Sequence, residues 1–364
     1  MRSFVIQTVT TLVSLTCLYG LLIAASFALA PTQQVSEIID TSQADKSIYS
    51  TAPKYLSFAR TRLATPESKV LIVGASNADV GLRPDQIQPY VPCALVNNLS
   101  IGNENATEMR QTVDLVHFVQ DQKMRLNNTL VFGIWYGDFG DSVDRWPPSM
   151  RKNGETDIEV ELYRYGFYRR DAGEPRALLP ASWLPAEEIL VRPFIVIESV
   201  ARRLTAKIRS YVFIRPPNKN EGEREAAHFN ADEKRDATAY WNNQMGHKND
   251  VSADQFAEFE DTIGRLLDAR ERVVIVDLPI PTWHQNATIY DAKYRLRLAA
   301  LVKKFSGRDG FAFIDMPDLN NDDTYSDEVH PKPSLARIWA ERIGKTVKSI
   351  ACTGGPSARV QAGN

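Results

Sequence analysis

The sequence predicts an α/β protein with a central parallel β-sheet, a mostly helical insertion and an N-terminal transmembrane helix. Short apolar runs recur at residues 70–73, 94–96, 130–135, 273–276 and 311–314, and such runs are typical of strands buried on both faces of a parallel sheet. Helical patterns separate or follow most of these runs, with apolar residues three or four positions apart. Strands that alternate with helices indicate βαβ units, and therefore parallel strands.

The first thirty residues form an apolar segment that precedes these units. Arg2 is the only charged residue before Glu37, and residues 4–30 are predominantly apolar. Since a helix needs about 20 such residues to cross a membrane, we expect residues 1–30 to form an uncleaved anchor with a cytoplasmic N-terminus. A cleavable signal peptide is the alternative, because residues 28–30 match a small-x-small cleavage site. Either interpretation places the rest of the chain in the periplasm or outside the cell.

The remaining chain divides into segments of different character. Residues 31–69 are polar apart from a short helix near residues 55–59, and we expect a stalk or linker. An α/β domain is predicted in two parts, residues 70–140 and 255–350, with a mostly helical insertion at residues 141–254 and a disordered tail at residues 351–364. The longest amphipathic patterns predict helices at residues 106–120, 189–212, 255–267, 290–305 and 334–350.

Charge and composition exclude several classes of protein. The chain has 43 Lys and Arg residues against 45 Asp and Glu residues, so nothing suggests a nucleic-acid partner, which usually requires a basic surface. No metal-ligand spacing and no glycine-rich phosphate loop is present, and we therefore expect neither a metal nor a cofactor. Cys93 and Cys352 lie outside the anchor. They either pair in an oxidising compartment or remain free thiols, and both alternatives stay open.

A serine follows the first predicted strand directly, in the order Gly74-Ala75-Ser76. The carboxyl ends of parallel strands are where open α/β sheets bind ligands, and a turn after glycine can direct a hydroxyl group outward. The same residue could equally cap the next helix, because serine is a preferred N-cap. Ser76 is therefore a candidate nucleophile that needs a partner.

The partner is predicted near the C-terminus, where Asp327 and His330 lie between the last predicted strand and the last predicted helix. A general base needs a second group that holds its ring in one tautomer, and a carboxylate three residues earlier can do this. Asp114 and His117 have the same spacing, but they fall inside the predicted amphipathic helix at residues 106–120, where His117 is expected to pack in the core. Ser76, His330 and Asp327 together form a candidate catalytic triad.

The order and placement of these residues resemble the SGNH (GDSL-like) hydrolase superfamily. In that family the nucleophile follows the first strand, where Ser76 lies, and a DxxH sequence near the C-terminus supplies the remaining members, here Asp327 and His330. The resemblance covers about residues 70–140 and 255–350. It implies a flavodoxin-like, three-layer α/β/α fold around the parallel sheet.

The resemblance also implies an oxyanion hole. The backbone N–H groups of Ser76 and Gly102 are the expected donors, with the side chain of Asn103 or Asn77 as a further candidate donor.

The chain departs from the family pattern at two points. The family's GDS sequence is replaced by Gly-Ala-Ser, and the asparagine of its third block has no clear equivalent. Trp135 and Tyr136 occupy that third block. With Asn77 they are the candidate substrate-binding residues, although plain packing is the alternative for the two aromatic rings.

These departures resemble membrane-anchored SGNH-like proteins that modify bacterial envelope polymers, such as alginate O-acetylation proteins and the D-alanylation protein DltD. The resemblance implies an extracytoplasmic serine esterase or O-acyltransferase acting on acyl groups, most simply acetyl, of an envelope or secreted polysaccharide. Its partners would be an acylated glycan, the membrane and a membrane-bound O-acyltransferase. A non-catalytic assembly or glycan-binding subunit is the main alternative, and a lipase-like esterase is a third.

Overall fold

The computed structural model describes residues 2–30, 38–140, 155–213, 221–246 and 249–352. Five parallel strands form the central sheet, in the spatial order β2 (Leu95–Asn98), β1 (Lys69–Gly74), β3 (Thr129–Ile134), β6 (Arg272–Asp277) and β7 (Phe311–Asp315). Numbered along the chain, the sheet strands run 2-1-3-4-5, the order of doubly wound sheets of the flavodoxin type. The predicted parallel α/β architecture is confirmed, and all five predicted strands are present.

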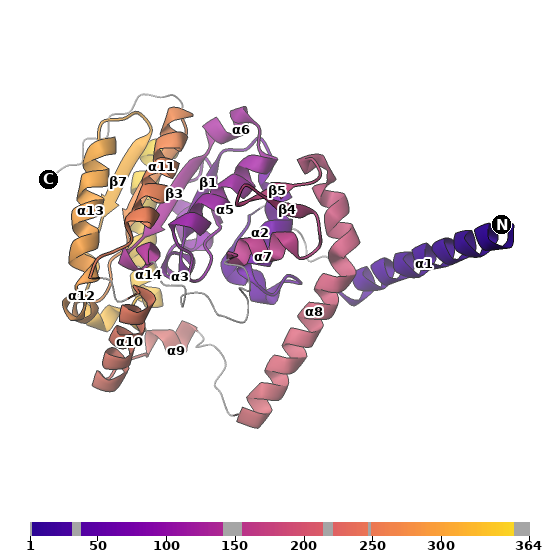
Figure 1. The fold of residues 1–364 in the computed structure, drawn as a ribbon. Helices are drawn as coiled ribbons and strands as arrows, with labels where there is room; N and C mark the ends of the chain where they lie inside the picture. The colour runs from indigo at the N-terminus through magenta and orange to yellow at the C-terminus, as the bar shows by residue number, and fades with distance from the viewer. Residues whose placement is uncertain (1, 31–37, 141–154, 214–220, 247–248, 353–364) are drawn as a thin grey trace.

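Helices cover both faces of the sheet and make three layers (Figure 1). One face packs against α5 (Ala106–Val119), α11 (Ala253–Asp268) and α13 (Tyr290–Phe305). The other face packs against α3 (Ser76–Gly81), α4 (Pro84–Ile87) and α14 (Pro333–Ala351). Along β1, Leu71 and Val73 join the first core while Val70 and Ile72 join the second. This burial on both faces explains the uninterrupted apolar run that predicted the strand.

The segment before β1 differs from its prediction. Residues 38–68 are not a stalk, since Ile39, Leu56 and Leu63 are fully buried in the first core. The Asn98 N–H donates to the Ile39 carbonyl at 2.9 Å, which adds a short bridge beside β2. Helix α2 (Ala52–Ala59) completes the segment. The apolar residues of this segment are spread among polar ones without a sustained helical or strand periodicity, which is why the sequence pattern suggested a linker.

The described residues of the predicted insertion, between β3 and β6, are mostly helical. They hold four α-helices, α7 (Asp157–Tyr163), α8 (Leu184–Phe213), α9 (Glu221–Glu225) and α10 (Ala231–Gln244), and a short 3-10 helix at Ala181–Trp183. They also hold an antiparallel hairpin, β4 (Tyr168–Asp171) and β5 (Glu174–Ala177), that the sequence did not predict. The hairpin strands are four residues each and largely exposed, so they lack the apolar run of a buried strand. Two short helices elsewhere in the chain are α6 (Gln122–Asn127) and α12 (Thr282–Ala287).

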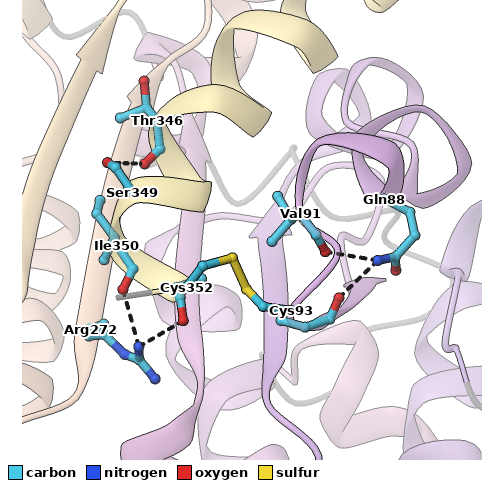
Figure 2. The surroundings of a disulfide bond; sticks show 10 residues. Gln88, Val91, Cys93, Arg272, Thr346, Ser349, Ile350 and Cys352 are labelled. Atoms are coloured by element: carbon cyan, nitrogen blue, oxygen red, sulfur yellow. Dashed lines mark hydrogen bonds between the residues drawn. A yellow bond between two sulfur atoms is a disulfide. The ribbon is translucent and has the colours of Figure 1, made fainter. Parts of the chain in front are cut away.

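A disulfide joins Cys93 to Cys352, with their Cα atoms 5.6 Å apart. Figure 2 shows that it ties the end of α14 to the loop before β2. Beside it, Arg272 donates to the carbonyls of Ile350 and Ala351 at 3.1 and 3.2 Å. The pairing that the sequence left open is thus present. The predicted disordered tail lies outside the described residues from residue 353 onward.

Helix α1 (Arg2–Leu29) extends away from the domain (Figure 1). It is long and apolar enough to cross a membrane, and among its residues only Ser26 is buried by the rest of the protein. A signal sequence passes the same test, so cleavage and anchoring both remain compatible with this helix.

Candidate active site

Ser76 lies at the carboxyl edge of the sheet, where β1 passes into α3. Gly74 makes this junction possible, because a Cβ there would lie 2.4 Å from the carbonyl oxygen of Gly133 and 2.7 Å from the Ala78 Cβ. Only glycine therefore allows β1, β3 and the first turn of α3 to approach so closely. Ser76 is the first residue of α3, beside the point where the strand order reverses.

The loop 325–331 carries the other two members of the predicted triad. Tyr325 and Pro331 form an antiparallel bridge at its base, and the Ser326 N–H donates to the His330 carbonyl at 3.0 Å. Within the loop, Asp327 Oδ1 accepts the N–H groups of Val329 and His330 at 3.0 and 2.8 Å. This Asx turn explains the DxxH spacing, because it brings the histidine ring back to the carboxylate that caps its own backbone.

The structure brings Ser76, His330 and Asp327 together in one hydrogen-bonded chain. Ser76 Oγ lies 2.8 Å from His330 Nε2, and His330 Nδ1 lies 2.9 and 2.8 Å from the two Asp327 carboxylate oxygens. Since a carboxylate can only accept, Nδ1 carries the proton and Nε2 is free to accept the Ser76 hydroxyl proton. The aspartate therefore holds the histidine in the tautomer that a general base requires.

The electrostatics of the pair agree with this assignment. Burial by itself lowers the pKa of His330. The charge of Asp327 and its hydrogen bond raise that pKa by more than burial lowers it, so the net shift is upward from 6.5. Burial raises the pKa of Asp327, yet His330 and the two backbone N–H groups outweigh it and lower the pKa from 3.8. The carboxylate thus stays ionised while the imidazole is made more basic.

Gly102 lies beside Ser76, as the family resemblance implies. After β2 the chain continues along β1, with the Leu99 N–H donating to the Ile72 carbonyl at 2.8 Å and the Ile101 N–H donating to the Gly74 carbonyl at 3.0 Å. A Cβ on Gly102 would lie 4.0 Å from the Ser76 Cβ. Because Ser76 is the first residue of a helix, its N–H has no intrahelical acceptor. The two N–H groups are thus suitable candidates for an oxyanion hole.

The two asparagines proposed as helpers differ in their surroundings. Asn103 is exposed and has a φ of +65°, a left-handed conformation that asparagine tolerates better than most residues. Asn77 is fully buried, and its Oδ1 accepts the Ala78 N–H at 2.9 Å. Its Nδ2 has no hydrogen-bond partner among the described residues. Asn77 therefore carries a spare donor directly after the nucleophile.

Trp135 and Tyr136 have 3% and 0% of their surface exposed, so they lie in the core rather than on an open surface. Trp135 packs edge-on against Trp241 of the insertion, with ring centroids 4.5 Å apart. The Tyr136 hydroxyl donates to His284 Nε2 at 2.6 Å, and His284 Nδ1 donates to the Glu328 carbonyl at 2.8 Å. Both aromatic rings therefore have the packing role that the sequence analysis gave as the alternative to substrate binding. Their contact with a substrate stays a prediction.

The same chain of hydrogen bonds reveals a role that the sequence did not show. Tyr136 and His284 connect the end of β3 to the loop that carries Asp327 and His330. Burial lowers the pKa of His284 to about 4, so its ring is neutral and can both accept from the tyrosine and donate to the carbonyl. Nothing in the sequence around His284 predicts this support, because its two partners are 148 and 44 residues away.

Two further charged residues near the triad were also missed. Asp79 follows Ser76 by one helical turn, and burial together with the nearby Asp40 raises its pKa to about 7. Arg224, in α9 of the insertion, donates to the Pro331 carbonyl at 2.6 Å. Burial lowers the Arg224 pKa, while Asp327 and Asp79 favour its charge. The i, i+3 spacing to Ser76 is a signal that could have identified Asp79, whereas Arg224 lies in a polar run without any pattern.

Comparison with models of known protein families finds no match, and a search of curated protein sequences finds none either. Within the described residues, no group of three or more His, Cys, Asp and Glu side chains is arranged to hold a metal ion. The functional argument consequently depends on the geometry of the site itself.

Proposed function

We propose that this chain is a serine esterase or O-acyltransferase of the SGNH type that acts on acyl groups, most simply acetyl, of an envelope or secreted polysaccharide. The single observation that carries the proposal is the hydrogen-bonded chain from Ser76 Oγ through His330 to Asp327, with 2.8 Å between the hydroxyl and Nε2. The placement of that chain at the carboxyl edge of a parallel sheet supports the same conclusion.

The proposed reaction proceeds through an acyl-enzyme. Ser76 Oγ attacks the ester carbonyl carbon while its proton passes to His330 Nε2, and Asp327 stabilises the imidazolium that forms. The tetrahedral intermediate collapses, its C–O bond to the leaving alcohol breaks, and that alkoxide takes the proton from Nε2. Water or a sugar hydroxyl, deprotonated by His330 Nε2, then attacks the acyl carbon. The bond from that carbon to Ser76 Oγ breaks, and Oγ takes the proton back from Nε2. The choice between these two nucleophiles separates hydrolysis from transfer.

The developing oxyanion would be stabilised by the N–H groups of Ser76 and Gly102. Loss of one donor of this kind typically costs about 2.7–4 kcal/mol in transition-state stabilisation. The third block of the SGNH pattern normally supplies an asparagine, and here that region is occupied by the buried Trp135 and Tyr136. The unpartnered Nδ2 of Asn77 is the substitute donor that the chain offers.

Two features favour an envelope polymer over a small soluble ester. Helix α1 would hold the domain at a membrane, and the disulfide is of the kind that persists in oxidising, extracytoplasmic compartments. The insertion also contacts the catalytic loop, through Arg224 on one side and through Trp241 Nε1, which donates to Glu328 at 3.3 Å, on the other. Elements that cover the loop could limit the access of water to an acyl-enzyme, as acyl transfer requires.

A fluorophosphonate probe and an acetyl ester test the proposal directly. We expect the full chain in detergent to be labelled and to turn over the ester, and we expect Ser76→Ala to abolish both activities. Matched circular dichroism and thermal unfolding of the two proteins would show that the variant is folded. Absence of labelling in the folded wild-type protein would contradict the proposal. That outcome would favour the alternative, a non-catalytic assembly or glycan-binding subunit, for which the replaced third block is the supporting observation.

A further inference from the structure

Helix α8 carries a long apolar stripe that the protein does not cover. The stripe consists of side chains that are 46–63% exposed, namely Leu190, Phe194, Ile197, Val200, Leu204 and Ile208. Successive members are three or four residues apart, so a helix with 3.6 residues per turn places them all on one side. A monomeric soluble protein rarely leaves so continuous an apolar surface exposed without a binding role.

The opposite side of α8 holds the helix on the domain. Val191 and Ile195 are buried in the first core. Glu198 accepts from the buried Lys54 at 2.5 Å, and the hydroxyl groups of Ser50 and Ser199 lie 2.9 Å apart. These contacts fix the rotation of the helix about its own axis. The stripe therefore faces outward because of how α8 is docked, and a rotation that buried it would break these contacts.

Basic residues flank the stripe on both sides in the second half of α8. By helical periodicity, Arg202 and Arg209 lie along one edge, and Arg203 and Lys207 lie along the other. Arg202 also pairs with Glu198 at 3.0 Å, and Arg203 also donates to the Ser47 carbonyl at 2.8 Å, so both charges are partly held by the domain. No acidic residue occurs between residues 199 and 213. An apolar face bordered by Lys and Arg is the pattern of a helix that lies in a membrane interface, with its charged groups extended toward anionic headgroups.

Helix α1 contacts α8 at the start of this stripe. Tyr19 packs near Phe194 with ring centroids 6.2 Å apart and also hydrogen-bonds to the Leu190 carbonyl. The Arg192 guanidinium lies 4.1 Å from the centre of the Phe27 ring and donates to the Ala30 carbonyl. Figure 1 shows that α8 runs across the inner end of α1 rather than along it.

The length of α1 places this crossing at the membrane surface. The helix has 28 residues, whereas about 20 suffice for the hydrocarbon core. At 1.5 Å per residue, the remaining eight or so residues extend about 12 Å beyond the core, which is enough to pass through one headgroup region of about 5–8 Å. The contacts with α8 run from Tyr19 to Ala30, at the C-terminal end of α1. A helix that runs across α1 there, rather than along it, would lie along the membrane surface.

We propose that α8 lies on the outer surface of the membrane that α1 spans, with its apolar stripe in the lipid interface and its basic edges against anionic headgroups. The contact would orient the domain on the membrane, which a single transmembrane helix cannot do by itself. The inference rests on the anchoring part of the proposed function and is independent of the triad. A partner helix is the competing occupant of the stripe, and the contact between α8 and α1 favours the lipid surface.

Site-specific labels in the full chain test the proposal in vesicles of phosphatidylcholine and phosphatidylglycerol. Cys17, the free cysteine in α1, reports insertion of the anchor when labelled with an environment-sensitive fluorophore. In a Cys17→Ser background, Leu204→Cys places the label on the stripe. Ala206→Cys is the matched control, since it is an exposed position on the same helix about half a turn away.

We expect brominated lipids to quench the Leu204→Cys label several-fold more strongly than the Ala206→Cys label, with the Cys17 label also quenched. Equal quenching at the two α8 positions, with both accessible to aqueous iodide, would overturn the proposal while leaving the anchor in place. A Leu204→Cys label shielded from both quenchers would overturn it in favour of a protein partner. None of these readings requires catalytic activity, so failure of the proposed esterase chemistry would not be confused with failure of this inference.

Discussion

The surroundings of His330 and His284 differ in a way that separates catalysis from support. Each ring uses both nitrogens in hydrogen bonds, and each accepts a hydroxyl at Nε2, from Ser76 and Tyr136 respectively. At Nδ1, however, His330 faces the Asp327 carboxylate, whereas His284 faces the Glu328 carbonyl. The His330 side chain is 25% exposed and His284 is fully buried.

The pKa values of the two rings move in opposite directions for this reason. Burial lowers both, but only His330 has a charged partner that reverses the shift, so its pKa rises above 6.5 while that of His284 falls to about 4. A neutral, buried imidazole with two satisfied nitrogens is a structural link. An accessible imidazole beside a carboxylate is suited to act as a general base, which is the role proposed for His330. The number of hydrogen bonds does not distinguish these roles, but the charge of one partner does.

The largest expected effect is the loss of the base. His330→Gln should lower ester turnover by a factor on the order of 10⁴ or more, because His330 is the only hydrogen-bond partner of Ser76 Oγ among the described residues. The free energy of unfolding should change little, since the ring is partly exposed and Asp327 keeps its backbone hydrogen bonds. Steady-state kinetics and denaturant unfolding of the same preparation measure both quantities. Substantial remaining turnover would show that His330 is not the base.

Asp327→Asn removes the charge that distinguishes the two histidines. Turnover should fall by a factor on the order of 10⁴, as for other triads that lose this carboxylate. His330 must be neutral to accept a proton, so wild-type kcat/KM should rise with pH through a midpoint above 6.5. In the variant that midpoint should move to lower pH.

A pH profile of kcat/KM checks the shift, with Asp79→Asn as a control because Asp79 has a pKa of about 7 nearby. Retention of the original midpoint in Asp327→Asn would assign it to another group.

Removal of the disulfide should affect stability without affecting the site. Cys93 precedes β2 and Cys352 follows α14, so their bond lies near the amino ends of the strands, whereas Ser76 lies at the carboxyl end of β1. Cys93→Ser should lower the free energy of unfolding by about 2–5 kcal/mol while the turnover of folded protein stays unchanged. Denaturant titration and an ester assay well below the unfolding midpoint test this. A loss of turnover in the folded variant would mean that the disulfide also influences the site at the carboxyl ends of the strands.

His284→Asn should have the smallest expected effect, a loss of stability with little change in turnover. The variant loses the link between Tyr136 and the Glu328 carbonyl, which should cost about 1–3 kcal/mol in the free energy of unfolding. Tyr136→Phe is the matched control, because it removes only the hydroxyl and should cost about 0.5–1.5 kcal/mol.

For both substitutions we expect turnover to fall by about tenfold or less, with the midpoint of the pH profile unchanged. If His284→Asn shifted that midpoint or abolished turnover, the distinction between a base and a support would be wrong.

The local pattern of the sequence was sufficient for the sheet, most of the helices and the three candidate triad residues. Strands buried on both faces of a sheet carry an apolar run, so their signal is continuous and lies within a few positions of the chain. The Asp327–His330 turn is equally local, since one residue caps the backbone of the other. Ser76 became a candidate from its place after a strand and a glycine, and it joined the triad through the order of the three residues, which resembles the SGNH pattern.

Three features were decided by the tertiary structure alone. Residues 38–68 join the core because distant strands offer them a surface, although their own pattern is that of a linker. His284 becomes a structural link because Tyr136 and Glu328, far away in sequence, converge on its two nitrogens. The outward face of α8 is decided by the contacts of Glu198 and Ser199 with the segment before β1. Sequence patterns for strands, helices and turns depend on neighbours in the chain. Burial, pKa and exposure depend on neighbours in space, and the sequence alone does not identify those spatial neighbours.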